Sequence, residues 1–126
     1  MDEIIEKIIE LAAEDTAIDS LWLYGSRARG DHRSDSDYDL AIKYRARIAD
    51  PVKSRLRPEL QAMDWTVLGG EISVADIEQL AVPLAVNVVN EGQLLLDKAP
   101  FETASLYQKI WAKWDDWQYH RAANVG

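Results

Sequence analysis

The stretch that decides the fold is GSRARGDHRSDSDYDL, residues 25–40. It follows an apolar run, residues 21–24, which predicts a buried strand, so Gly25 and Ser26 lie where that strand ends and a helix begins. Glycine lets the backbone approach a ligand closely, the first N–H groups of a helix point outward, and the Ser26 hydroxyl adds a donor. The turn is therefore a candidate phosphate-binding site.

Two aspartates follow on the next predicted strand. Residues 38–44 have strand character, and side chains alternate between the faces of a strand. Asp37 and Asp39 therefore share one face, and Tyr38 and Leu40 share the other. Two adjacent carboxylates beside a phosphate turn are suited to holding Mg²⁺.

These features resemble the signature of the nucleotidyltransferase fold. Gly25-Ser26 is followed by ten intervening residues and then by Asp37-x-Asp39. The short chain and its tail resemble the minimal nucleotidyltransferase (MNT) branch, which includes the antitoxins of HEPN/MNT toxin–antitoxin pairs. The resemblance implies an α/β fold with a small mixed β-sheet packed with helices and a long C-terminal helix. Ala28, Arg29, Gly30 and Ser36 extend the match.

The resemblance also implies the metal site. Asp37 and Asp39 would bind Mg²⁺, with ATP as the substrate, and a third carboxylate on a neighbouring strand commonly completes such a site. We predict Asp64 for this role, as catalytic residue and metal ligand, because an aspartate inside the predicted strand 62–68 is hard to explain as surface charge. An edge or turn aspartate is the alternative reading. The other candidates for the third carboxylate are Glu59 and Glu71.

Nucleotide-binding roles are carried over by the same resemblance. Gly25 and Ser26 would hold the β- and γ-phosphates. Arg29 would bind the triphosphate or position the loop, the alternative being a plain salt bridge to Asp31 or Asp35. Ser36 would shape the turn that leads to Asp37.

Composition limits the class of protein. A chain of 126 residues predicts a single domain, 1–126, and 48% hydrophobic with 29% charged residues is typical of a soluble globular protein. The lack of cysteine excludes disulfides and thiolate zinc sites, which leaves oxygen ligands for a metal. A net charge of −8 argues against direct binding to nucleic acid or to an anionic membrane. With no long apolar run and an acidic N-terminus, we expect a cytoplasmic protein.

Basic residues nevertheless gather around the predicted phosphate turn, and as a group they predict a local anion funnel. The alternative is a solvated charged surface that offsets nearby aspartates. The cluster comprises Arg27, Arg29, Arg33, Lys43, Arg45, Arg47 and Lys53.

The remaining elements follow from periodicity and end signals. An amphipathic helix is expected at residues 2–14, and a long aromatic-rich helix at 100–122. The last helix places Tyr107, Ile110, Trp111, Trp114 and Trp117 on one face, which either belongs to the core or docks another copy or another protein. Other expected elements are a strand at 20–24, a helix at 51–57, a strand at 62–68, a helical turn at 76–80, a helix at 83–91 ended by Gly92, and a strand at 93–97.

The sequence thus predicts an ATP-dependent, Mg²⁺-requiring nucleotidyltransferase. By resemblance to MNT antitoxins, it would transfer AMP to a tyrosine of a cognate HEPN ribonuclease toxin and so neutralise it. One alternative is an antitoxin that neutralises its partner by binding alone. Another is transfer to a small molecule such as an aminoglycoside.

Overall fold

The computed structural model describes residues 3–33, 36–45 and 72–125, with side chains up to residue 121. Its centre is a four-stranded mixed sheet in the order β3-β2-β1-β4. β1 (Ile18–Tyr24) pairs antiparallel with both β2 (Tyr38–Tyr44) and β4 (Gln93–Asp97), whereas β2 pairs parallel with β3 (Ile72–Asp76). The mixed sheet confirms the predicted fold class.

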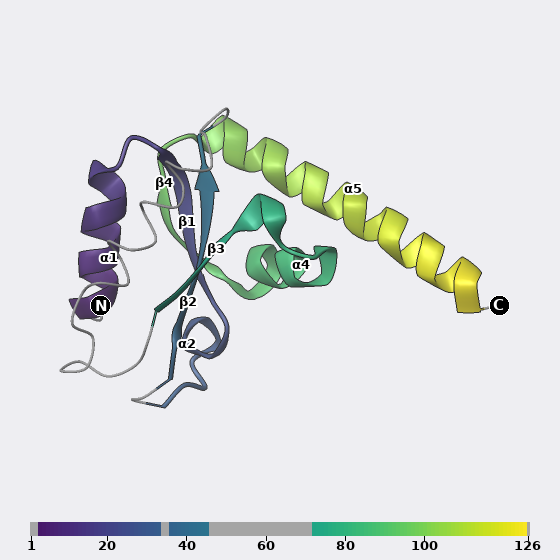
Figure 1. Ribbon diagram of the computed structural model, residues 1–126, viewed down its shortest axis with the longest axis horizontal. Helices are drawn as coiled ribbons and strands as arrows, with labels where there is room; N and C mark the ends of the chain where they lie inside the picture. The colour runs from purple at the N-terminus through teal and green to yellow at the C-terminus, as the bar shows by residue number, and fades with distance from the viewer. Residues whose placement is uncertain (1–2, 34–35, 46–71, 126) are drawn as a thin grey trace.

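Helices cover both faces of this sheet (Figure 1). α1 (Glu3–Glu14) packs Ile4 and Ile8 against Leu21, Leu40 and other buried residues of one face. On the opposite face, α4 (Val82–Glu91) and α5 (Pro100–Val125) pack around the buried Trp22 and Ala41 of β1 and β2. The two central strands, β1 and β2, are largely buried because each face of the sheet has its own helical cover.

Most predicted elements are confirmed. Helix α2 (Ser26–Arg29) follows β1, and the predicted turn near residue 77 is the 3₁₀ helix η1 (Ile77–Gln79), which begins after Asp76. The Asp76 carboxylate accepts a hydrogen bond from the Glu78 N–H and so caps η1. β3 was not predicted, and the expected helix 51–57 and strand 62–68 lie outside the described residues.

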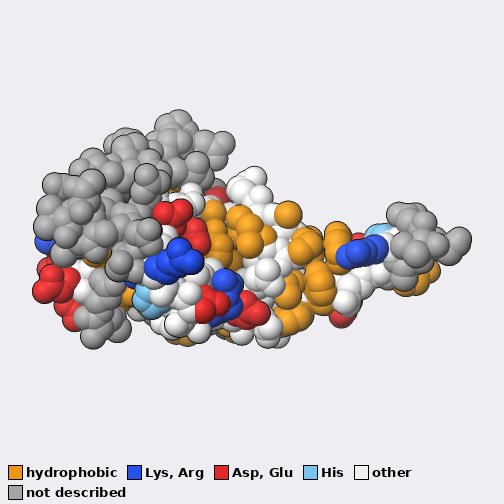
Figure 2. Space-filling view, turned by 90° about the horizontal axis from the view of Figure 1, so that it is seen from below, with side chains coloured by type: hydrophobic (Ala, Val, Ile, Leu, Met, Phe, Trp, Pro, Cys, Tyr) orange, Lys and Arg blue, Asp and Glu red, His pale blue; other side chains and the backbone are white. Residues whose placement is uncertain are grey.

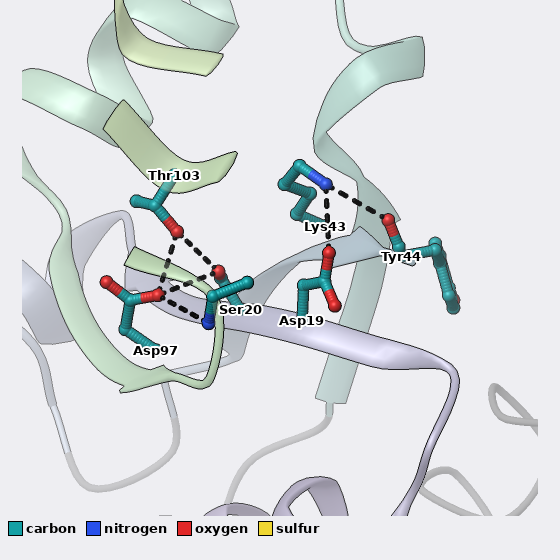
Figure 3. Close-up of polar contacts among 7 residues, drawn as sticks. Asp19, Ser20, Lys43, Tyr44, Asp97 and Thr103 are labelled. Atoms are coloured by element: carbon teal, nitrogen blue, oxygen red, sulfur yellow. Dashed lines mark hydrogen bonds and ion pairs between the residues drawn. The ribbon is translucent and has the colours of Figure 1, made fainter. Parts of the chain in front are cut away.

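α5 begins in a buried polar junction (Figure 3). The Asp97 carboxylate accepts hydrogen bonds from the Ala99 N–H at 3.2 Å and the Thr103 hydroxyl at 2.9 Å. Thr103 in turn lies 2.8 Å from the Ser20 hydroxyl on β1. These bonds fix where α5 begins relative to the sheet, and from there the helix runs well beyond α4 (Figure 1).

Among the described residues, no helix has the length and apolar character needed to cross a membrane.

Candidate active site

The predicted phosphate turn joins β1 to α2. Gly25 has φ +74°, in the region that favours glycine, and its carbonyl accepts hydrogen bonds from the N–H groups of Ala28 and Arg29 at 3.2 Å. α2 lasts a single turn because Gly30, at φ +82°, closes it in the left-handed conformation. Gly25 therefore turns the chain sharply from a strand into the start of a helix, where N–H groups point outward.

Gly25 lies directly against the carboxylate of Asp39. The sheet register pairs Tyr24 with Asp39, which brings the end of β1 beside the start of β2. A Cβ added to Gly25 would lie 2.4 Å from Asp39 Oδ2, which is closer than non-bonded atoms approach each other. The predicted phosphate turn and a candidate metal ligand thus lie next to each other, and only glycine leaves room for the Asp39 carboxylate at this position.

The environment of Asp39 disfavours its charged form. Burial raises the pKa of Asp39, the negative charge of Asp37 raises it further, and Arg29 lowers it in part. Asp39 is half-buried on β2, and Asp37 is exposed just before that strand. Asp37 and Asp39 thus place two carboxylates that repel each other at the start of β2. A divalent cation bound by their oxygens would stabilise the charged form of both.

Neither strand beside Asp39 supplies a further carboxylate at the paired position. β1 offers Tyr24 there, and the parallel register places Ser73 of β3 opposite Asp39. Within residues 3–33, 36–45 and 72–125, no cluster of three or more His, Asp or Glu could hold a metal. Asp64 and the alternatives Glu59 and Glu71 lie outside the described residues, so a third carboxylate stays a prediction.

Arg29 lies on the outer side of the site, where it forms ion pairs with two exposed carboxylates. Its Nε is 3.3 Å from Asp31 Oδ2, the salt bridge that the sequence left as an alternative, and its Nη1 is 3.8 Å from Glu91 Oε2. Exposed pairs of this kind are weak, so Arg29 can exchange them for a phosphate. Its influence on the pKa of Asp39 indicates that its charge acts on the site.

The Ser36 hydroxyl shapes the turn before Asp37. It accepts a hydrogen bond from the Arg33 N–H at 2.8 Å, while the Ser36 N–H donates to the Arg33 carbonyl at 3.1 Å. These local bonds agree with the turn role predicted for Ser36.

The predicted anion funnel is smaller than the sequence suggested. Lys43 is only 7% exposed, and its Nζ is 3.1 Å from the Asp19 carboxylate (Figure 3). Arg27 is buried as well, and Arg47 and Lys53 lie outside the described residues. Lys43 is thus used within the fold, a role that a list of charges cannot reveal because it depends on how β1 and β2 pair.

A family comparison decides what this arrangement is. The model of the family described as polymerase beta, nucleotidyltransferase matches residues 6–101. The chain belongs to this nucleotidyltransferase family. The glycine turn and both aspartates lie within the matched residues.

Solved structures show the same fold at low sequence identity. A chain in the crystal structure of a toxin–antitoxin with AMP-PNP matches with a TM-score of 0.76 and 20% identity, covering 96% of this chain and 94% of that one. A chain from a tri-AMPylated Shewanella oneidensis HEPN toxin in complex with MNT antitoxin gives a TM-score of 0.71 and 19% identity, covering 99% and 96%. The MntA–HepT toxin–antitoxin gives 0.71 and 18% over the same shares. No curated protein sequence matches at a significant level.

Proposed function

We propose that this nucleotidyltransferase uses ATP and Mg²⁺ to transfer AMP to a tyrosine of a HEPN ribonuclease toxin, and that it thereby acts as the antitoxin. The observation that supports the transferase part is the close approach of Gly25 to Asp39, since Gly25 belongs to the turn proposed to bind phosphate and Asp39 is a candidate metal ligand. A nucleotide whose phosphates follow that turn has its reacting phosphorus beside the two aspartates.

Asp37 and Asp39 are the residues that would hold Mg²⁺, with Asp64 proposed as the third carboxylate. Burial raises the pKa of Asp39, and the negative charge of Asp37 raises it further, so a bound cation would relieve the repulsion between the two carboxylates. When bound, Mg²⁺ supplies charge stabilisation for the phosphate oxygens. The protein's own contribution is to position the phosphates and the attacking oxygen.

The chain's own residues align the reacting groups. Gly25 and Ser26 hold the β- and γ-phosphates at the start of α2, and Arg29 adds a positive charge on the outer side. The tyrosine oxygen forms a bond to the α-phosphorus while the bond from that phosphorus to the leaving oxygen breaks. Pyrophosphate departs and the phenolic proton passes to solvent. Such transfers depend mainly on alignment and electrostatic stabilisation.

Two solved neighbours support the nucleotide and the acceptor. One is a toxin–antitoxin with AMP-PNP, an ATP analogue, and another contains a tri-AMPylated HEPN toxin in complex with MNT antitoxin. Each has the fold of this chain. They make a HEPN toxin the acceptor to test first.

Neutralisation by binding alone is the competing function. The exposed aromatic side chains of α5 are the observation that supports it. Hydrophobic side chains continue from the body of the molecule onto this helix (Figure 2). Phe101 is 80% exposed, Trp111 41% and Tyr119 70%. Exposed aromatic groups of this kind are typical of surfaces that dock a partner.

One experiment separates the candidates. The chain is incubated with labelled ATP, Mg²⁺ and the protein encoded by the neighbouring gene, and the partner is analysed by mass spectrometry and for ribonuclease activity. We expect AMP on a tyrosine of the partner and loss of its ribonuclease activity. The double variant Asp37→Ala/Asp39→Ala should leave the partner unmodified and active.

Two outcomes would overturn this proposal. A partner that is neutralised without gaining AMP mass would leave the binding-only antitoxin. Label on an added aminoglycoside, with none on the protein partner, would identify a small-molecule transferase.

A further inference from the structure

Arg27 is a buried cation next to the phosphate turn. It follows Ser26 in α2 and is only 8% exposed. Its guanidinium carbon lies 3.8 Å from the centre of the Tyr38 ring, a close cation–π contact. Arginine is seldom buried unless the protein uses its donors, so the contacts of Arg27 indicate what the side chain does.

Those donors bind the segment that leads to Asp37. Arg27 Nε donates to the Ser36 carbonyl at 2.9 Å, and Nη2 donates to the Arg33 carbonyl at 3.4 Å. The Ser36 carbonyl belongs to the peptide bond that enters Asp37. Tyr38, which stacks on the guanidinium, is the next residue after Asp37. Arg27 therefore contacts the chain on both sides of Asp37.

Arg27 is also part of the chain segment that forms the proposed phosphate turn. Arg27 lies two residues after Gly25, and Gly25 lies against Asp39. Asp39 sits on a paired strand, which fixes it, whereas Asp37 precedes that strand and is exposed. Strand pairing therefore positions Asp39, whereas the position of Asp37 depends on contacts made by other side chains.

We propose that Arg27 is a positioning residue, which holds Asp37 at the distance from Asp39 and the phosphate turn that metal–nucleotide binding requires. This inference rests on the proposed function, because it assigns Asp37 to the metal. In this role the guanidinium acts through the carbonyls of Arg33 and Ser36 and the ring of Tyr38.

Electrostatics alone predicts the opposite result when Arg27 is replaced. Removing a positive charge near a cation site should strengthen binding of a divalent cation, since like charges repel. Releasing Asp37 from its position should weaken that binding, as happens when the groups that orient a metal ligand are lost. The sign of the change in affinity therefore distinguishes a positioning role from a charge effect.

The test measures binding of Mn²⁺ with AMP-PNP, from the loss of the free Mn²⁺ signal in electron paramagnetic resonance beyond the loss that AMP-PNP causes without protein. We expect Arg27→Gln to weaken Mn²⁺ binding on the order of tenfold. Arg27→Lys, which keeps a charge against the Tyr38 ring but has one compact donor group, should give an intermediate loss. If Arg27→Gln does not fold, Arg27→Lys carries the test.

Lys43→Met is the matched control. It also removes a buried cation, here one that belongs to β2, and it leaves Asp19 without the ion pair, so it should lower the melting temperature. It touches none of the groups that Arg27 holds, and Mn²⁺ affinity should therefore stay unchanged. Amide hydrogen exchange at Ser36 and Tyr38 should accelerate in the Arg27 variants and not in Lys43→Met.

The outcomes separate this inference from the proposed function. If the wild-type chain binds no Mn²⁺ with AMP-PNP, the proposed metal site is wrong and the role of Arg27 falls with it. If the wild-type chain binds and Arg27→Gln binds equally well or more tightly, only the positioning role is wrong. A lower melting temperature with unchanged affinity would likewise show that Arg27 serves the fold alone.

Discussion

Gly25 and Gly30 bracket α2, and both have a positive φ, +74° and +82°, but their ψ angles differ, at −156° and 7°. An added Cβ would collide with the Asp39 carboxylate at Gly25 and would meet nothing within 4 Å at Gly30. Gly30 is in the left-handed region, where alanine should cost about 1–2 kcal/mol of backbone strain. Gly25 is in a region that almost only glycine adopts, where alanine should cost about 1–3 kcal/mol. Only Gly25→Ala should also displace Asp39, and we expect it to lower AMP transfer on the order of 100-fold.

Gly30→Ala is the control for that prediction, measured by initial rates of pyrophosphate release alongside urea unfolding. Gly30→Ala should lose less stability than Gly25→Ala and keep most of its transfer rate. Equal rate losses in the two variants would mean that strain in α2, and not the approach of Gly25 to Asp39, limits the reaction.

Asp39 supports a prediction about pH. Its pKa is raised in the folded, metal-free protein above the usual 3.8, so the native state binds this proton more tightly than the unfolded chain does. Ionised Asp39 therefore destabilises the metal-free fold at neutral pH, and this destabilisation is lost as the pH falls through the raised pKa toward 3.8. In EDTA, Asp39→Asn should melt at a higher temperature than the wild type at pH 7, with a gain that shrinks on acidification.

Added Mg²⁺ should reverse that order. The wild type should gain stability because the cation binds the native state, whereas Asp39→Asn should gain little. The readout is a thermal shift series from pH 7 to pH 4 with and without Mg²⁺. The same Mg²⁺ response in both proteins would contradict the assignment of Asp39 as a ligand.

At the scale of elements, the attachment of α5 to the sheet depends on Asp97. Its carboxylate accepts hydrogen bonds from the N–H of Ala99, the residue before α5, and from the hydroxyl of Thr103, which also contacts Ser20 on β1 (Figure 3). We expect Asp97→Ala to lower the free energy of unfolding by about 2 kcal/mol, because two hydrogen bonds at the start of α5 are lost together. Urea unfolding followed by circular dichroism measures this change.

An exposed carboxylate on the same helix provides the comparison. Asp116 pairs with His120 on the surface, where such pairs contribute little. Asp116→Ala should thus leave the unfolding free energy nearly unchanged. A loss as large as that of Asp97→Ala would indicate that α5 is stabilised by its own surface charges and not by its junction with the sheet.

At the scale of the whole molecule, the sequence predicted what local patterns control. α1 and β2 follow from hydrophobic periodicity, and the turn at Gly25 follows from a glycine between a strand and a helix. β3 was missed because Ile72–Asp76 is a short edge strand, half-exposed in part, whose identity comes from its parallel pairing with β2. The buried roles of Arg27 and Lys43 were missed for the same reason, since their partners are set by tertiary structure.

The arrangement of the molecule also separates the two activities proposed for it. The candidate active site lies where β1 meets β2 and α2, whereas the outer part of α5 extends away from the sheet (Figure 1). Trp111 is exposed on that helix, and Trp117 stacks on Trp114 at 5.1 Å between ring centres. If the toxin docks there, removing Trp111 and Trp117 should weaken docking without changing the nucleotide site.

We therefore expect Trp111→Ala/Trp117→Ala to weaken binding of the toxin by about 2 kcal/mol or more, roughly thirtyfold in Kd, as loss of buried tryptophan anchors does. Its affinity for AMP-PNP should match that of the wild type. Asp37→Ala/Asp39→Ala should behave in the opposite way, keeping the toxin but losing AMP transfer. Isothermal titration measures the affinities for the toxin and for AMP-PNP, and mass spectrometry of the toxin measures AMP transfer. An α5 variant that keeps full toxin affinity would place the docking surface elsewhere on the molecule.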